Sequence, residues 1–112
     1  MRIALHSVIA DGAVDDYRAH HARVPDELTA LFSHAGIREW VIWRSGDRLF
    51  HLVDCDDWDA AMAVVGPDPA NTRWQADIGR FVAGFRDADG KDDFAPLENV
   101  WSLTGQRAAA AG

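Results

Sequence analysis

The feature that most constrains the fold is a pair of β-rich runs whose apolar side chains point to both faces. Residues 39–44 and 48–54 flank a Ser-Gly-Asp sequence at residues 45–47, which predicts a β-hairpin. Apolar side chains alternate along the first run, with Trp40 and Ile42 on one face and Val41 and Trp43 on the other. Because both faces are apolar, each needs a covering layer.

Upstream of the hairpin, residues 14–35 carry apolar side chains at alternating steps of three and four. This spacing predicts an amphipathic helix that ends near Gly36. Pro25 removes one backbone donor, so we expect a kink there or a new helix with Asp26 and Glu27 in its first turn. The other expected elements are a strand at 2–9, helices at 56–65 and 71–82, a loop at 87–96 and a last strand at 97–103.

The resulting order is β-α-β-β-α-β, the ferredoxin-like unit of the α+β class. Helices can cover only one face of its sheet, so we expect a homodimer in which two sheets face each other and form a dimeric α/β barrel. The 112 residues suffice for one domain. We expect residues 1–104 to form it and residues 105–112 to be a flexible C-terminal tail.

Charge and composition narrow the partners. The chain has 18 acidic and 11 basic residues, so it lacks the basic surplus that nucleic acid or an anionic membrane would attract, and we expect neither as a partner. No apolar run approaches the ~20 residues of a membrane span, and the first residues do not resemble a signal peptide. We therefore expect a cytoplasmic protein. Its single cysteine, Cys55, is interpreted as a structural thiol in a reducing compartment.

Tyr17 and His21 occupy the apolar stripe of the first helix, where a core would favour Leu or Val. A phenol and an imidazole one turn apart could hydrogen-bond adjacent oxygens of one ligand and move a proton. The alternative is that both are core residues whose polar atoms bond to the backbone. His20 falls off the stripe by one position, so we expect it at the flank of the helix.

Other kinds of site have weaker support. No His-x-x-x-His or Cys/His spacing predicts a metal site, which leaves only a less favoured set of His6, His21 and His51. His6 and His51 lie on expected strands, and either could line a cavity. The glycines form no phosphate-binding loop. Trp74 is interpreted either as a core residue or as a stacking platform flanked by the Gln75 amide, and the pattern does not choose between them.

At these residues the chain resembles the L-rhamnose mutarotases over residues 2–103. The matching motifs are Tyr-Arg-Ala-His-His at 17–21, Pro-Asp-Glu-Leu at 25–28, Arg-Trp-Gln at 73–75 and Leu-Glu-Asn-Val-Trp at 97–101. The resemblance implies a small dimeric α/β barrel that interconverts the α and β anomers of a deoxy-hexose without a cofactor. It selects His21 over His20 and implies that His21 is the catalytic proton donor.

The resemblance also implies that Tyr17 binds the sugar. From their side-chain chemistry we expect Trp40 and Trp74 to cover the apolar ring face and Gln75 to hydrogen-bond a hydroxyl, which completes the substrate-binding set. Two of these residues depart from the family pattern. Trp40 stands where the family usually has Tyr, and Gln75 stands where it usually has the second of two consecutive Trp residues. Hydrogen-bonding sites discriminate strongly among hydroxyl patterns, so L-fucose is an alternative to L-rhamnose as the substrate.

Two other functions remain open on this architecture. One is a small dimeric α/β-barrel monooxygenase or haem-binding protein in which His21 ligates the haem. The other is a non-catalytic sugar-binding module. Fold alone cannot separate these functions from a mutarotase.

Overall fold

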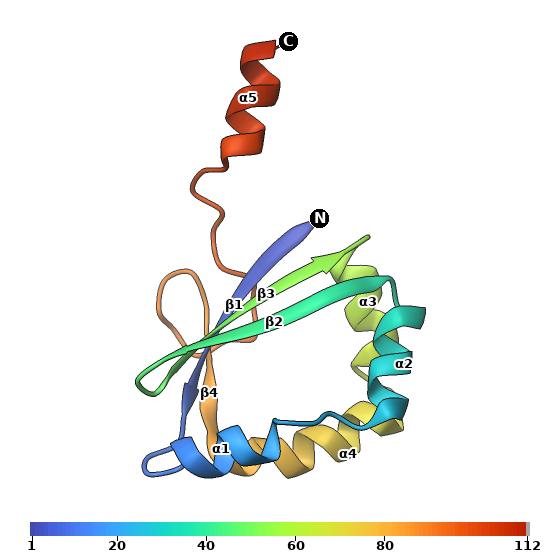
Figure 1. Cartoon of the computed structure of the whole chain (residues 1–112), viewed down its shortest axis with the longest axis vertical. Coiled ribbons are helices and arrows are strands. Elements are labelled where there is room, and N and C mark those ends of the chain that lie inside the picture. The colour runs from blue at the N-terminus through green and yellow to red at the C-terminus, as the bar shows by residue number, and fades with distance from the viewer. Residues whose placement is uncertain (112) are drawn as a thin grey trace.

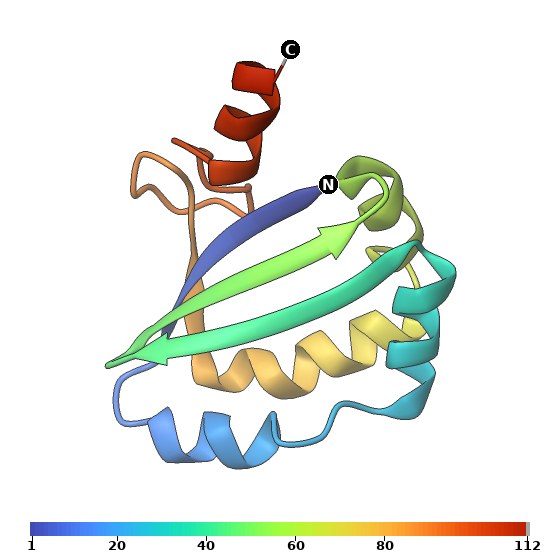
Figure 2. The same ribbon diagram turned by 45° about the horizontal axis from the view of Figure 1, so that its top comes forward.

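The computed structural model describes residues 1–111. In chain order, the elements of this part are β1 (Arg2–Ile9), α1 (Val14–His20), α2 (Asp26–His34), β2 (Ile37–Ser45), β3 (Arg48–Cys55), α3 (Trp58–Val65), α4 (Pro69–Ile78), the 3₁₀ turn η1 (Gly79–Phe81), β4 (Val82–Arg86) and α5 (Leu103–Ala111). The strands form an antiparallel sheet in the order β2-β3-β1-β4. Helices α1 to α4 all lie on one side of the sheet (Figures 1 and 2). The fold is the predicted α+β, ferredoxin-like one.

The two faces of the sheet differ in burial, as strand alternation requires. On β3, Leu49, Val53 and Cys55 are buried toward the helices. Between them, Phe50 and Leu52 are 39% and 51% exposed on the other face. The predicted apolar character of both faces is therefore present, and one face lacks cover within the described chain. Cys55 is fully buried in the core, which agrees with its interpretation as a structural thiol.

The hairpin and the interruption at Pro25 are both confirmed. Strands β2 and β3 are joined by Gly46 and Asp47, and Gly46 has a φ of 58°, a conformation that glycine adopts readily. Helix α1 ends at His20 and α2 starts anew at Asp26, directly after Pro25. The long apolar stripe is thus divided between two helices, because proline fits the start of a helix and not its interior.

The prediction of the last strand was wrong. The edge strand next to β1 is β4, which begins at Val82. We predicted Val82 to be the last residue of a helix, but α4 already ends at Ile78. Residues 97–103 pair with no strand in the part of the chain described, although the Leu97 amide donates to the Ala4 carbonyl at 2.8 Å. An edge strand needs few residues, and β4 contains Gly84, so its own pattern is weak.

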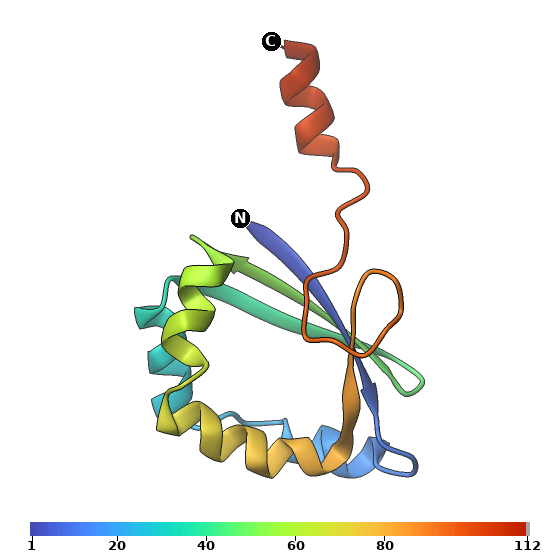
Figure 3. The ribbon, with the colours of Figure 1, turned by 180° about the vertical axis from the view of Figure 1, so that it is seen from behind.

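The C-terminal segment extends away from the body of the molecule (Figures 1 and 3). It ends in α5, whose side chains are exposed, where we expected a flexible tail. The domain boundary at residue 104 stays a prediction. None of the helices in residues 1–111 combines the length and apolar character that a bilayer crossing requires.

Candidate active site

A cavity of about 960 Å³ lies between the sheet and the helices. Its walls come from the inward faces of the strands, from α1 to α4 and from the loop after β4, which contributes Phe94. Small-molecule sites usually measure ~300–1,000 Å³, so this cavity has room for a monosaccharide and water. Every residue in the predicted site lines it, namely Tyr17, His21, Trp40, Trp74 and Gln75.

Tyr17 and His21 meet at the C-terminal end of α1. The backbone amide of His21 donates to the Tyr17 carbonyl at 2.9 Å, and the two ring centroids lie 5.4 Å apart. Burial raises the pKa of the Tyr17 phenol to about 12 and lowers the pKa of the His21 imidazole below its ordinary value. At neutral pH the pair is therefore an uncharged phenol beside a largely uncharged imidazole. Among residues 1–111, no hydrogen bond ties either polar group to another residue.

Trp74 completes this part of the wall from α4. The buried side of α4 carries Ala70, Trp74 and Ile78, which are four residues apart and therefore share one face. The Trp74 and His21 rings meet edge to face, with centroids 5.2 Å apart and planes at 90°. Trp74 is thus both a core residue and a wall of the cavity, and the two readings of this residue do not exclude each other.

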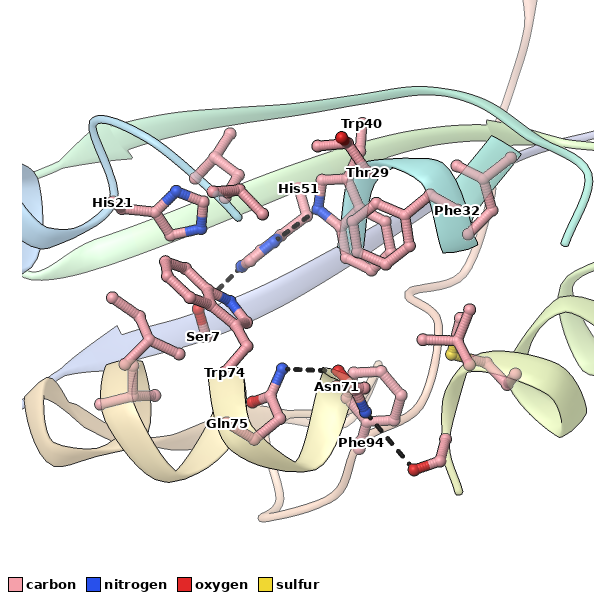
Figure 4. Close-up of a pocket in the computed structure, with 18 of the residues that line it drawn as sticks. Ser7, His21, Thr29, Phe32, Trp40, His51, Asn71, Trp74, Gln75 and Phe94 are labelled. Atoms are coloured by element: carbon pink, nitrogen blue, oxygen red, sulfur yellow. Dashed lines mark hydrogen bonds between the residues drawn. The ribbon is translucent and has the colours of Figure 1, made fainter. Parts of the chain in front are cut away.

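Gln75 lies on the next position of α4 and is exposed. Its Nε2 donates to Oδ1 of Asn71 at 3.3 Å, and both side chains lie at the edge of the cavity (Figure 4). The Gln75 amide therefore belongs to the cavity lining but is more exposed to solvent than Trp74.

Trp40 reaches the cavity from β2, where it stacks on Phe32 with ring centroids 5.5 Å apart. Its Nε1 donates to Nδ1 of His51 at 3.1 Å, and Nε2 of His51 lies 2.9 Å from Oγ of Ser7 (Figure 4). Burial first, then the neighbouring His21 and His6, lowers the pKa of His51 to about 4. Because the indole N–H of Trp40 already donates to His51, it is not free to donate to a ligand.

Ser7 is the cavity residue that sequence reasoning missed. It is 1% exposed on β1, in phase with the buried Leu5 and Ile9. A hydroxyl on the core face of a strand was the available signal, since an unpaired polar group there would be costly. His51 was expected only as one of two histidines able to line a cavity, and it does so.

His20 and His6 lie away from the cavity. As expected for the helix flank, His20 contacts Asp77 of α4, with its Nε2 2.6 Å from a carboxylate oxygen. His6 stacks on Phe50, on the uncovered face of the sheet, with centroids 5.0 Å apart. Because the sheet separates His6 from the cavity, His6, His21 and His51 do not form one metal site. No group of three or more potential metal ligands occurs in the described part of the chain.

The second and third sequence motifs are joined by an ion pair. Arg73 of α4 donates to Glu27 of α2 at 2.8 Å. Both side chains are more than half exposed, so the pair orients two helices at the surface and does not face the cavity.

Comparison with known proteins identifies the family. A model described as L-rhamnose mutarotase matches residues 2–103, whereas no curated protein matches. The crystal structure of an L-rhamnose mutarotase from Formosa agariphila aligns with a TM-score of 0.73 at 18% identity, covering 92% of this chain and 98% of that chain.

Other solved structures share the fold. Tetracenomycin F2 cyclase from Streptomyces glaucescens has a TM-score of 0.66 at 19% identity, with 92% of this chain and 96% of that chain covered. A putative antibiotic biosynthesis monooxygenase from Bordetella bronchiseptica has a TM-score of 0.62 at 18% identity, with 89% and 96% covered. These likenesses establish the architecture, and the family match extends over nearly the whole chain. The chain belongs to the L-rhamnose mutarotase family, a family of carbohydrate isomerases.

Proposed function

We propose that the protein is a cofactor-free aldose mutarotase acting on a 6-deoxy-L-hexopyranose, with L-rhamnose as the first candidate and L-fucose as the second. The observation that carries this proposal is the Tyr17–His21 pair. Both residues line the cavity, burial raises the pKa of the Tyr17 phenol and lowers the pKa of the His21 imidazole, and neither polar group is hydrogen-bonded to another residue of the described chain. Family membership supports the same conclusion.

The reaction requires a proton to leave one sugar oxygen and another to reach a second oxygen. A ring nitrogen of His21 accepts the proton of the anomeric hydroxyl as C1=O forms and the bond from C1 to the ring oxygen breaks. The ring oxygen takes up a proton, which gives the open-chain aldehyde. Rotation about the C1–C2 bond and the reverse steps give the other anomer. A neutral imidazole has one acceptor and one donor nitrogen, so His21 can serve both transfers, with or without a water.

The other residues of the cavity would hold the sugar. Tyr17, a neutral phenol, donates a hydrogen bond to a sugar oxygen. Trp74 and Trp40 offer ring faces to the apolar C–H surface and the methyl group, since the Trp40 N–H is already bonded to His51. Gln75 forms a hydrogen bond with a sugar hydroxyl at the edge of the cavity. These roles extend the predictions from the sequence and are supported by the position of each residue in the lining.

A homodimer completes the proposal. The uncovered face of the sheet presents Trp43, Phe50 and Leu52, which are 63%, 39% and 51% exposed. A second copy packed sheet to sheet would remove this apolar surface from water, at roughly 25 cal/mol for each Å². A cytoplasmic location remains a prediction from the sequence.

The fold is also found in monooxygenases and in a polyketide cyclase, so it does not by itself select a reaction. Exchange NMR of anomeric protons tests directly whether the protein catalyses mutarotation. L-Rhamnose, L-fucose and D-glucose are each mixed with catalytic amounts of protein. We expect faster exchange between the anomeric signals of a 6-deoxy-L-sugar and no change for D-glucose. Unchanged exchange for both deoxy sugars would contradict the proposal and favour a binding module or a monooxygenase.

A further inference from the structure

The hydrogen bonds from Trp40 through His51 to Ser7 have a fixed direction. An indole N–H can only donate, so the 3.1 Å contact requires Nδ1 of His51 to be an unprotonated acceptor. A neutral imidazole then carries its proton on Nε2. That nitrogen lies 2.9 Å from Oγ of Ser7, so His51 donates and Ser7 accepts. Trp40 therefore sets the tautomer of His51.

This direction leaves the Ser7 proton available. A serine hydroxyl has one proton and two lone pairs, and His51 occupies a lone pair. Ser7 lines the cavity and is 1% exposed, and within residues 1–111 its Oγ has no other hydrogen-bond partner. A buried hydrogen-bond donor without an acceptor is costly, so the Ser7 hydroxyl favours a ligand that supplies an acceptor atom.

We propose that Ser7 is a specificity-determining residue that donates a hydrogen bond to an oxygen of the bound sugar, with Trp40 and His51 as positioning residues. This inference rests on the proposed function, because it takes a sugar to be the occupant of the cavity. Because Nε2 of His51 carries a proton and donates to Ser7, it cannot accept the serine proton, which is left for an oxygen of the sugar. The site therefore selects an oxygen that can act as an acceptor.

His51 has a positioning role and does not carry the transferred proton. It is 5% exposed, and its low pKa keeps it neutral throughout the physiological range. The hydrogen bond from Trp40 holds His51 in one tautomer, and this tautomer keeps the Ser7 hydroxyl oriented as a donor toward the cavity. Proton transfer is left to His21, which has no hydrogen bond to another residue of the described chain and whose imidazole faces the same cavity (Figure 4).

The first test compares Ser7→Ala, Ser7→Thr and wild type in the anomer-exchange experiment with L-rhamnose and, in parallel, L-fucose. Loss of one hydrogen bond to substrate should raise KM by about tenfold in Ser7→Ala, with a smaller change in kcat. Ser7→Thr keeps the hydroxyl and should restore most of the affinity. Ser45→Ala is the matched control, because Ser45 is an exposed serine at the end of β2 that does not line the cavity.

Sugar analogues then identify the oxygen that Ser7 contacts. Monodeoxy L-rhamnoses lack one hydroxyl each, and the analogue without the contacted oxygen should bind wild type and Ser7→Ala equally. The corresponding deoxyfluoro sugar keeps a weak acceptor and should bind wild type better than that deoxy sugar does. A fluorine that gave no advantage at any position would argue against a donor role for Ser7.

The second test observes the tautomer directly by ¹⁵N NMR of the histidine side chains. Wild type should show His51 protonated on Nε2 and bare on Nδ1, and Trp40→Phe should release this preference. His51 protonated on Nδ1 in wild type would overturn the inference, as would a KM of Ser7→Ala equal to that of wild type. If wild type accelerates neither sugar, the proposed function fails and the role of Ser7 in sugar binding fails with it. An active wild type with an unaffected Ser7→Ala rejects the role of Ser7 alone.

Discussion

The imidazole of His21 and the indole of Trp74 meet at a right angle, with their ring centroids 5.2 Å apart. The two residues are far apart in sequence, His21 at the C-terminal cap of α1 and Trp74 on α4, and each belongs to a separate motif. Their contact places an apolar ring against the group that we propose moves the proton. It therefore links the burial of Trp74 to the acid–base properties of His21.

Removing the indole should raise the pKa of His21. Burial is the main cause of its lowered pKa, so Trp74→Ala, which admits water to the ring, should shift the pKa back toward its ordinary value of 6.5. A pH titration of the His21 ring signals by NMR measures the shift. Trp101→Ala removes a tryptophan that is 62% exposed and is the matched control. A His21 pKa unchanged in Trp74→Ala would show that the indole does not exclude water from the imidazole.

Tyr17→Phe should keep the fold and weaken catalysis. The ring is 6% exposed and its packing is retained, whereas the hydroxyl proposed to contact the sugar is lost. We expect kcat/KM to fall by about tenfold, the usual scale for one neutral hydrogen bond. Thermal unfolding monitors the fold of the variant. Kinetics equal to those of wild type would make Tyr17 a core residue only.

Acid should destabilise the protein through His51. Its pKa is about 4 in the folded state and 6.5 ordinarily, so the unfolded chain binds the proton first as the pH falls. The folded state is then expected to lose stability progressively from about pH 6.5 to pH 4, by about 3 kcal/mol from this residue. Above pH 6.5 both states are neutral at His51, and this contribution is fully present.

Urea unfolding at a series of pH values measures this loss. His51→Gln lacks the titrating group, so its unfolding free energy should fall less steeply than that of wild type over the same range. The lowered pKa values of His6 and His21 act in the same direction and remain in the variant. Parallel pH profiles for the two proteins would contradict the assignment of the loss to His51.

A charge placed on the uncovered sheet face should prevent dimer formation. Trp43→Glu puts a carboxylate where the second sheet is proposed to pack, and burying an unpaired charge is costly. Light scattering after size-exclusion chromatography should give a dimer mass for wild type and a monomer mass for the variant. Val64→Glu alters a side chain on α3 that is 42% exposed and should leave the dimer intact. A monomeric wild type would contradict the dimer.

The ion pair between Glu27 and Arg73 should matter little to stability. Both side chains are more than half exposed, and such pairs contribute ~0–1 kcal/mol. Glu27→Gln is therefore expected to lower the free energy of unfolding by less than about 1 kcal/mol, as measured by urea denaturation. A much larger loss would mean that this motif has a role beyond orienting two helices.

The parts of the fold with strong local signals were predictable. The turn at residues 45–47, the interruption at Pro25 and the acidic first turn of α2 each follow from backbone chemistry. The edge strand was not predictable, because β4 is short, contains Gly84 and depends on pairing with β1. Residues 97–103 have the sequence pattern of a strand, but their local sequence does not indicate whether a partner strand is available to pair with them.

The candidate site divides in the same way. Tyr17 and His21 stood out because they are polar residues on an apolar stripe, and their helix places them together. The set of Trp40, His51 and Ser7 joins three strands, so it depends on the register of the sheet and could not be found from spacing along the chain. Register is a tertiary property that one strand's sequence only partly determines.

The most direct test of the account compares wild type, His21→Asn and His20→Asn by anomer-exchange NMR with the better of the two deoxy sugars. A positioned acid–base group contributes on the order of 10²–10⁴-fold, so His21→Asn should lose most of the acceleration while remaining folded. His20→Asn changes the adjacent histidine, which contacts Asp77 outside the cavity, and should retain its activity. Full acceleration by a folded His21→Asn protein would contradict the central claim that His21 transfers the proton.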